Sequence, residues 1–170
     1  MTQSDLTLKA PRLPRALVII GAASVIGSIA LVARFVAQPL HTPNWSLITG
    51  APLVIQIHLG AVVMALSIGA VLLIGPKGRV FHRTLGWVWS LFMLTAAVAS
   101  LFVRGLGNFG PLHVLSAVVL VMVPLAIYNA RRHRVGPHSR TMASVFLGGI
   151  LLAGTFAFLP DRLLWQVFFG

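Results

Sequence analysis

The sequence has no cysteine and almost no acidic residues. Among its 170 residues only Asp5 and Asp161 are acidic, whereas lysine and arginine together number 13. Without cysteine the chain cannot form a disulfide, an iron–sulfur cluster or a thiolate metal site. Neither acid lies within an apolar run, which disfavours carboxylate proton relays, carboxylate di-iron sites and glycosidase-type acid pairs. A Ser/His/Asp triad and a glycine-rich phosphate loop find no support either.

Charge of either sign is scarce, and apolar residues dominate the composition. The chain is 58% hydrophobic and 9% charged, with a mean hydropathy of +0.95, outside the usual range of soluble domains. It is therefore predicted to be a membrane protein in contact with the lipid bilayer. The net charge of +11 comes from short segments beside apolar runs, where it indicates orientation in the bilayer and not nucleic-acid binding.

Five apolar runs are each long enough to cross a membrane as a helix. They predict spans at residues 16–37, 53–74, 81–103, 112–130 and 140–159. Pro52 and Pro111 stand where the first turn of a helix tolerates proline, and the Gly-Pro pairs at 75–76 and 136–137 mark connections. The predicted fold is all-α, a single integral membrane domain over residues 1–170. It has a tail at 1–15, an anchor helix at 16–37 and a four-helix core at 53–160.

Lysine and arginine gather in alternate segments between the spans. The tail, the second connection and the fourth connection are basic, and all three fall on one side of the predicted membrane. Their basic residues are Lys9, Arg12, Arg15, Lys77, Arg79, Arg83, Arg131, Arg132, Arg134 and Arg140. By the positive-inside tendency we expect a cytoplasmic N-terminus and an outer C-terminus. The expected location is a bacterial-type inner (cytoplasmic) membrane, which the chain crosses several times.

Histidine is the residue type that remains to carry chemistry. Four of the six histidines each stand in the early part of a different predicted span. Neighbouring spans run in opposite directions, so His58 and His113 are expected at similar depth toward the outer face. For the same reason His82 and His138 are expected together near the inner face. Four helices thus provide two level pairs.

An internal resemblance supports this pairing. The segment that begins HLGAVVMALS at residue 58 can be aligned with the segment that begins HVLSAVVLVM at residue 113. The first and second histidines are 24 residues apart in one copy and 25 in the other, and a Gly-Pro pair precedes each second histidine. The pattern predicts a duplicated two-helix unit and a pseudo-twofold core.

Two imidazoles that face each other across a helical bundle suit a six-coordinate haem iron. They supply both axial nitrogens, and the apolar helix faces cover the macrocycle. Arg83 and Arg140 follow the inner histidines by one and two residues, where a guanidinium can pair with a haem propionate. The residues therefore favour a haem-binding bundle.

The four-histidine pattern and the helix order, over residues 53–160, resemble the cytochrome b561 family. In that family the second and fourth helices hold one haem, and the third and fifth hold another. The resemblance implies that His58 and His113 bind one haem b and that His82 and His138 bind a second. It implies transmembrane electron transfer, with a quinol, a small reductant or a redox partner protein at one face. From depth in the span, the outer haem is the more strongly expected of the two.

Simpler interpretations of the same residues stay open. The chain also resembles a family of small bacterial proteins described only as predicted membrane proteins. Histidines near helix ends are often interfacial, and arginines in inner loops are often signals of topology alone. One alternative is a cofactor-free accessory or scaffold subunit, and another is a small carrier that binds copper or zinc through histidine pairs. The sequence equally allows a homo-oligomer or a subunit of a larger complex.

Overall fold

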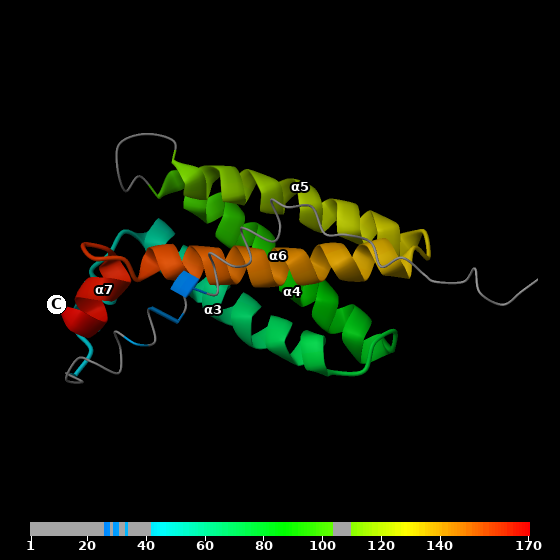
Figure 1. Cartoon of the computed structure of the whole chain (residues 1–170), viewed down its shortest axis with the longest axis horizontal. Coiled ribbons are helices and arrows are strands. Elements are labelled where there is room, and N and C mark those ends of the chain that lie inside the picture. Colours follow the sequence, from blue (N-terminus) through cyan, green and yellow to red (C-terminus); the bar gives the residue numbers. More distant parts are fainter. Residues whose placement is uncertain (1–25, 28, 31–32, 34–41, 104–109) are drawn as a thin grey trace, which may run out of the picture.

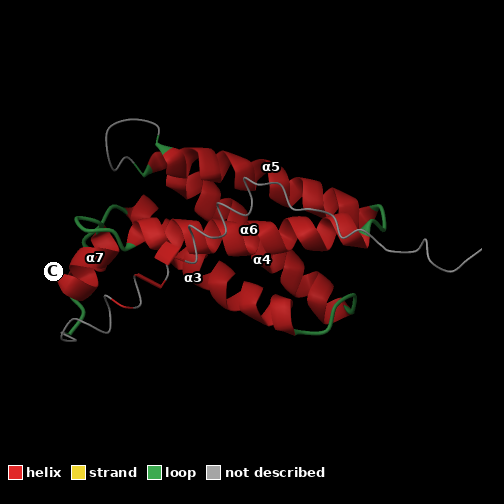
Figure 2. Ribbon diagram, in the orientation of Figure 1, coloured by secondary structure: helices red, strands yellow, loops and turns green. Residues whose placement is uncertain are grey.

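The computed structural model describes residues 26–27, 29–30, 33, 42–103 and 110–170 (Figure 1). Throughout these residues the regular structure is helical (Figure 2), which confirms the predicted all-α class. In chain order the elements are α2 (Ser46–Thr49), α3 (Leu53–Ile74), α4 (Val80–Phe102), α5 (Pro111–Arg131), α6 (Val135–Ala157) and α7 (Leu163–Phe169). Among the described residues, α3 to α6 are long and apolar enough to cross a membrane.

The predicted spans agree with α3, α4 and α5 to within one residue at each end. Helix α6 differs, because it begins at Val135, five residues before the predicted start, and ends at Ala157. The Gly136-Pro137 pair lies in the first turn of α6, where the missing N–H of proline has no intrahelical partner to lose. The pair therefore belongs to the helix. The sequence prediction that it marks a connection is wrong at this position.

The four long helices form a closed ring in which each packs against its neighbours. Helix α3 contacts α4, α4 contacts α5, α5 contacts α6, and α6 contacts α3. Helices α3 and α5 therefore lie diagonally opposite each other, as do α4 and α6. The buried core inside the ring consists of Ala65, Trp89, Met93, Ala97, Val119, Val123 and Val145.

Trp89 links α4 to α3 by a hydrogen bond. Its Nε1–H donates to the carbonyl oxygen of Ala65 at 3.0 Å, within the buried interior. Gly69, one turn further along α3, lies so close to the rings of Trp89 and Phe146 that a Cβ there would meet both. Small residues on α3 thus allow aromatic side chains from α4 and α6 to fill the centre of the bundle.

Two short helices, α2 and α7, close one end of the bundle and were not predicted. They lie together (Figure 1), joined by a bond from the backbone N–H of Asn44 to the carbonyl of Val167 at 2.9 Å. The rings of Trp45 and Phe168 meet edge to face, with centroids 6.0 Å apart. Both helices are too short to cross a bilayer, so a search for spans of about 20 apolar residues could not find them.

The first apolar run is described only in part. The predicted tail at 1–15 lies outside the described residues, and so does most of the predicted anchor at 16–37. Its described residues, 26, 27, 29, 30 and 33, are helical. Gly27 lies against α6, since a Cβ added there would stand 2.6 Å from Cγ2 of Thr155.

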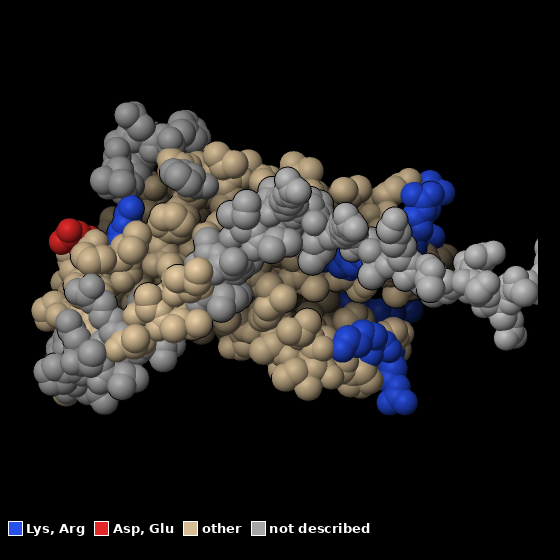
Figure 3. Space-filling model, in the orientation of Figure 1, with Lys and Arg blue, Asp and Glu red and all other residues tan. Residues whose placement is uncertain are grey.

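Positive charge gathers at one end of the bundle, where the α3–α4 and α5–α6 connections lie (Figure 3). We call this end, with its exposed residues Lys77, Arg79, Arg83, Arg131, Arg132, Arg134 and Arg140, the basic end. Asp161 and Arg162 lie at the opposite end, beside α7. The charge separation predicted from the sequence is therefore present along the long axis of the described bundle.

Candidate functional site

The four predicted ligand histidines lie on the faces of their helices that point into the bundle. On each helix the histidine precedes buried residues at helical spacing and so shares their face. The pairs are His58 with Ala61, His82 with Trp89, His113 with Ser116, and His138 with Val145. All four imidazoles are partly buried. The interior is thus lined by histidine near both of its ends.

Two of these histidines bond to backbone carbonyls of the neighbouring helix. Nδ1 of His58 lies 2.8 Å from the carbonyl oxygen of Ala96 on α4. Nδ1 of His138 lies 2.9 Å from the carbonyl oxygen of Ala126 on α5. A carbonyl oxygen only accepts, so each Nδ1 donates its hydrogen. In the neutral imidazole Nε2 then carries a lone pair, which is the arrangement found in metal-binding histidines.

His113 has the opposite arrangement. Its Nδ1 accepts a hydrogen bond from the backbone N–H of Gly110 at 3.2 Å, which caps the first turn of α5. Because Nδ1 uses its lone pair there, the neutral ring carries its hydrogen on Nε2. Nε2 of His113 is therefore a donor in this conformation. To bind a metal ion through Nε2, His113 would have to give up the cap.

His82 and His138 form the pair that the hydrogen bonds favour. They lie on the diagonally opposed helices α4 and α6, near the basic end, and are close enough to interact electrostatically. His138 is already held with Nε2 as an acceptor. In the outer pair His58 is held in the same way, so the pairs differ in their second histidine. Nδ1 of His113 accepts the bond from Gly110, whereas no hydrogen bond among the described residues commits the ring of His82 to the opposite tautomer. The bonding pattern thus ranks the inner pair above the outer, whereas depth along the spans had suggested the reverse order.

The two arginines predicted to pair with propionates are exposed at the basic end. Arg83 shares its face of α4 with Trp87 and Leu91, four and eight residues further on, which are 54% and 64% exposed. That face points out of the bundle, away from the stripe of His82 and Trp89. Arg140 of α6 is exposed as well. Both charges therefore stand beside the inner histidine pair without facing into it.

A serine pair joins α4 to α5 near the other end of the interior. The hydroxyls of Ser100 and Ser116 contact each other, and Ser116 is 7% exposed. Each also lies within hydrogen-bonding distance of a carbonyl in its own helix, that of Ala97 for Ser100 and that of Leu112 for Ser116. Sequence reasoning missed this contact. The only available signal was that Ser116 follows His113 by three residues, on the same helix face.

The number of histidine and acidic side chains that lie together limits which metal ions or cofactors the described residues can bind. Among them no three histidine or acidic side chains cluster into a candidate metal site. A tetrahedral zinc site normally takes three or four protein ligands. A haem iron takes only two, because the macrocycle supplies the other four nitrogens. The number of histidines in each predicted pair is therefore the number that a haem iron takes and fewer than a protein-ligated zinc ion takes.

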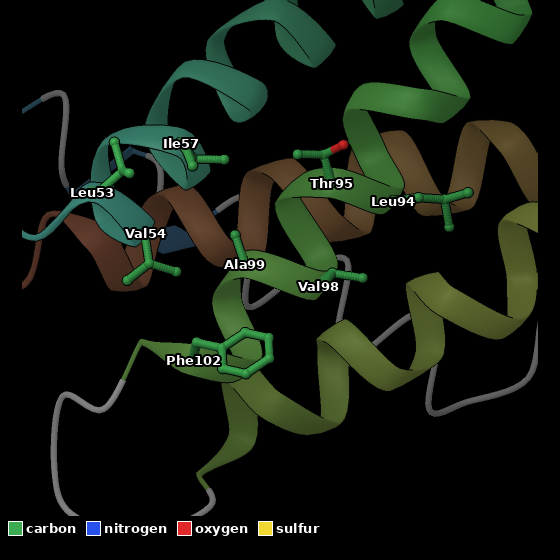
Figure 4. A pocket seen from close by; sticks show the side chains of 8 residues that line it. All are labelled: Leu53, Val54, Ile57, Leu94, Thr95, Val98, Ala99 and Phe102. Carbon is green, nitrogen blue, oxygen red and sulfur yellow. The ribbon is translucent and has the colours of Figure 1, made fainter.

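An open groove of about 680 Å³ runs between α3 and α4, in the halves of these helices that lie away from the basic end (Figure 4). Its lining residues are Leu53, Val54, Ile57, Leu94, Thr95, Val98, Ala99 and Phe102. Thr95 supplies the only polar side chain, and Leu53 and Phe102 are more than 60% exposed. The groove is thus part of the apolar outer surface of the bundle and is separate from the histidine stripes.

Comparison with known protein families gives a match over most of the described bundle. A family model described as "Predicted membrane protein (DUF2306)" matches residues 55–166, which run from α3 into α7. No curated protein and no solved structure is detectably similar to the chain. The match confirms the expected similarity to predicted membrane proteins, while the similarity to cytochrome b561 stays a prediction.

Proposed function

The chain belongs to this family of predicted membrane proteins, and we propose that its four-helix core is a b-type cytochrome of the membrane. His82 and His138 would hold a haem b near the basic end. The observation that carries the proposal is the bond from Nδ1–H of His138 to the carbonyl of Ala126, which keeps Nε2 as a lone-pair donor. Haem b, when bound, supplies one-electron redox chemistry.

The residues around the inner pair have distinct tasks in this proposal. Ala126 orients His138 through its carbonyl and fixes the tautomer. The apolar side chains of Ile127 and Met142, which pack against the core, exclude water from the region. Exposed Arg83 and Arg140 provide positive charge at the end toward which haem propionates would extend.

A second haem at His58 and His113 completes the proposed di-haem form. His58 is oriented by the carbonyl of Ala96 just as His138 is by that of Ala126. His113 has to release the backbone N–H of Gly110 before its ring can turn. Occupancy of the outer site is therefore coupled to the N-terminal cap of α5. With both sites filled, the protein would carry electrons across the membrane, with a quinol or small reductant as donor.

Single alanine variants of the inner histidines test the proposal. His82→Ala and His138→Ala should each abolish the same haem, because one lost axial ligand changes the coordination of a single iron. The matched control is His133→Ala, since His133 is exposed in the α5–α6 turn at the same end. Absorption spectra of the purified variants give the answer. If both inner variants retain the full spectrum, His82 and His138 are not the ligands.

A cofactor-free scaffold is the second candidate, and the two interhelical bonds of His58 and His138 favour it. Each bond links neighbouring helices, α3 to α4 and α5 to α6. Such bonds in membrane proteins contribute about 0.6 kcal/mol on average. If the protein is such a scaffold, the His58→Ala and His138→Ala variants should be less stable than the parent. Neither the parent nor the variants should absorb visible light. Colour therefore separates the two candidates before any mutation is made.

A further inference from the structure

We propose that Arg83 and Arg131, together with the ring of Trp87, form a binding site for the phosphate of an anionic phospholipid at the basic end. This site shares Arg83 with the haem proposal but does not require a bound haem. It uses the outward face of α4 and the end of α5, whereas the histidines occupy the inward faces.

The geometry brings the three side chains into one patch. The guanidinium carbon of Arg131 lies 5.3 Å from the centroid of the Trp87 ring, so that the end of α5 reaches across to α4. Arg83 precedes Trp87 by four residues on α4 and therefore shares its face. All three side chains are exposed. A guanidinium stacked on an aromatic ring keeps its N–H groups pointing outward in its own plane, where two can bind one phosphate.

Among the described residues the charge of this patch has no acidic counterpart. Their one acid, Asp161, lies at the opposite end of the bundle, so the seven cations of the basic end are free to attract anions from outside the chain. Phosphate oxygens of anionic lipids lie at the same level as interfacial tryptophans and arginines in a membrane. The basic end therefore matches the headgroup layer in charge and in aromatic content.

The surface next to the patch favours a lipid over a free phosphate ion. Leu91 follows Trp87 by four residues and is 64% exposed, and Val98 continues the outward face at 45% exposure. An apolar strip thus runs from the two arginines along α4 toward the other end. This strip can contact an acyl chain of a phospholipid whose phosphate is bound by the two arginines. Inorganic phosphate has no acyl chain and gains nothing from the strip.

Charge-preserving variants test the site on the full chain in detergent. Titration with phosphatidylglycerol, followed by native mass spectrometry, gives the affinity of the lipid, with phosphatidylcholine as the neutral reference. The Arg83→Lys, Arg131→Lys double variant keeps the charge but loses the planar guanidinium groups, which can each donate two parallel hydrogen bonds to one phosphate. We therefore expect about tenfold weaker binding of phosphatidylglycerol. The matched control is Arg79→Lys, Arg134→Lys, which changes two exposed arginines of the same end and should bind within about twofold of the parent.

Trp87→Leu provides a second, independent variant with unchanged charge. Loss of the ring frees Arg131 and should weaken lipid binding severalfold, while gel filtration and circular dichroism report an intact fold. Equal losses in the test pair and the control pair would overturn the proposal, since diffuse charge would then explain binding. Unchanged affinity in the test pair would overturn it as well. Displacement of phosphatidylglycerol by equimolar inorganic phosphate would show that the site takes a free anion and not a lipid.

Discussion

At the scale of single residues, Gly69 has the least room for a side chain among the described glycines. Nε1 of Trp89 would lie 2.7 Å from a Cβ at this position, and the ring of Phe146 would be closer still. Gly69 is buried, and both aromatic rings belong to or pack against the core. Because rings cannot give way as a flexible chain end can, the absence of a side chain at Gly69 is what lets α4 and α6 approach α3.

Gly69→Ala should therefore destabilise the bundle, even though alanine is the better helix former. We expect a loss of about 1–3 kcal/mol in the free energy of unfolding, which is typical of an overpacked core. Gly60→Ala on the same helix is the control, because no atom lies within 4 Å of the added Cβ. Unfolding in mixed detergent with SDS measures both. Equal stability of the two variants would mean that the rings do not pack on Gly69 as described.

The histidine positions, but not their hydrogen bonds, could be predicted from the sequence. The depth of His58 and His138 along their spans follows from their place in the apolar runs, and in the structure both rings are partly buried. Which ring nitrogen carries the hydrogen depends on the carbonyl that faces it, Ala96 or Ala126. Those carbonyls belong to other helices, and their position follows from the rotation of each helix about its axis. No sequence pattern encodes that rotation directly.

At the scale of elements, the ends of the helices depend on a few backbone conformations. His133, in the turn between α5 and α6, has a φ of 57°, and Gly78, between α3 and α4, has a φ of 82°. Both lie in the left-handed region, which favours glycine. The α3–α4 connection therefore has the residue that its backbone requires, whereas the α5–α6 connection tolerates a strained histidine.

Substitutions at these two turn positions should change the free energy of unfolding in opposite directions. His133→Gly should raise the free energy of unfolding by up to about 1 kcal/mol, because it relieves left-handed strain at the end of α5. Gly78→Ala should lower it by about 1 kcal/mol, since it introduces that strain. Thermal unfolding in detergent, followed by circular dichroism, gives both signs. A shift in the same direction for both variants would contradict the turn conformations.

The elements differ in how far the sequence predicts them. Long apolar runs identified α3, α4 and α5 almost to the residue, because the thickness of the bilayer imposes their length. The start of α6 was misplaced, since a Gly-Pro pair can end one helix or begin another. Helices α2 and α7 were missed because they are stabilised by contact with each other, as in the bond between Asn44 and Val167.

At the scale of the whole molecule, charge distinguishes the two ends of an otherwise apolar bundle (Figure 3). The basic end should lie in the cytoplasm by the positive-inside tendency. The chain has no cysteine, so single cysteines report the orientation without background. Thr49 lies at the end with α2 and α7, Ser139 lies at the basic end, and both are exposed.

Thr49→Cys should react with a membrane-impermeant maleimide in intact cells, and Ser139→Cys should react only after the cells are opened. Lysed cells serve as the control, because both cysteines have to be reactive there. The converse pattern would invert the topology and move the inner histidine pair to the outside. It would leave the pairing itself unaffected, because the distance between His82 and His138 does not depend on orientation.

The central claim, that the bundle holds haem b between His82 and His138, is tested most directly by the absorption spectrum of the purified full chain. Reduced and oxidised spectra, with the haem content determined as the pyridine complex, give the type and number of haems. We expect low-spin b-type haem with two nitrogen ligands, at one haem or more per chain. A protein purified from haem-replete cells that shows no Soret band would contradict the claim and favour the scaffold.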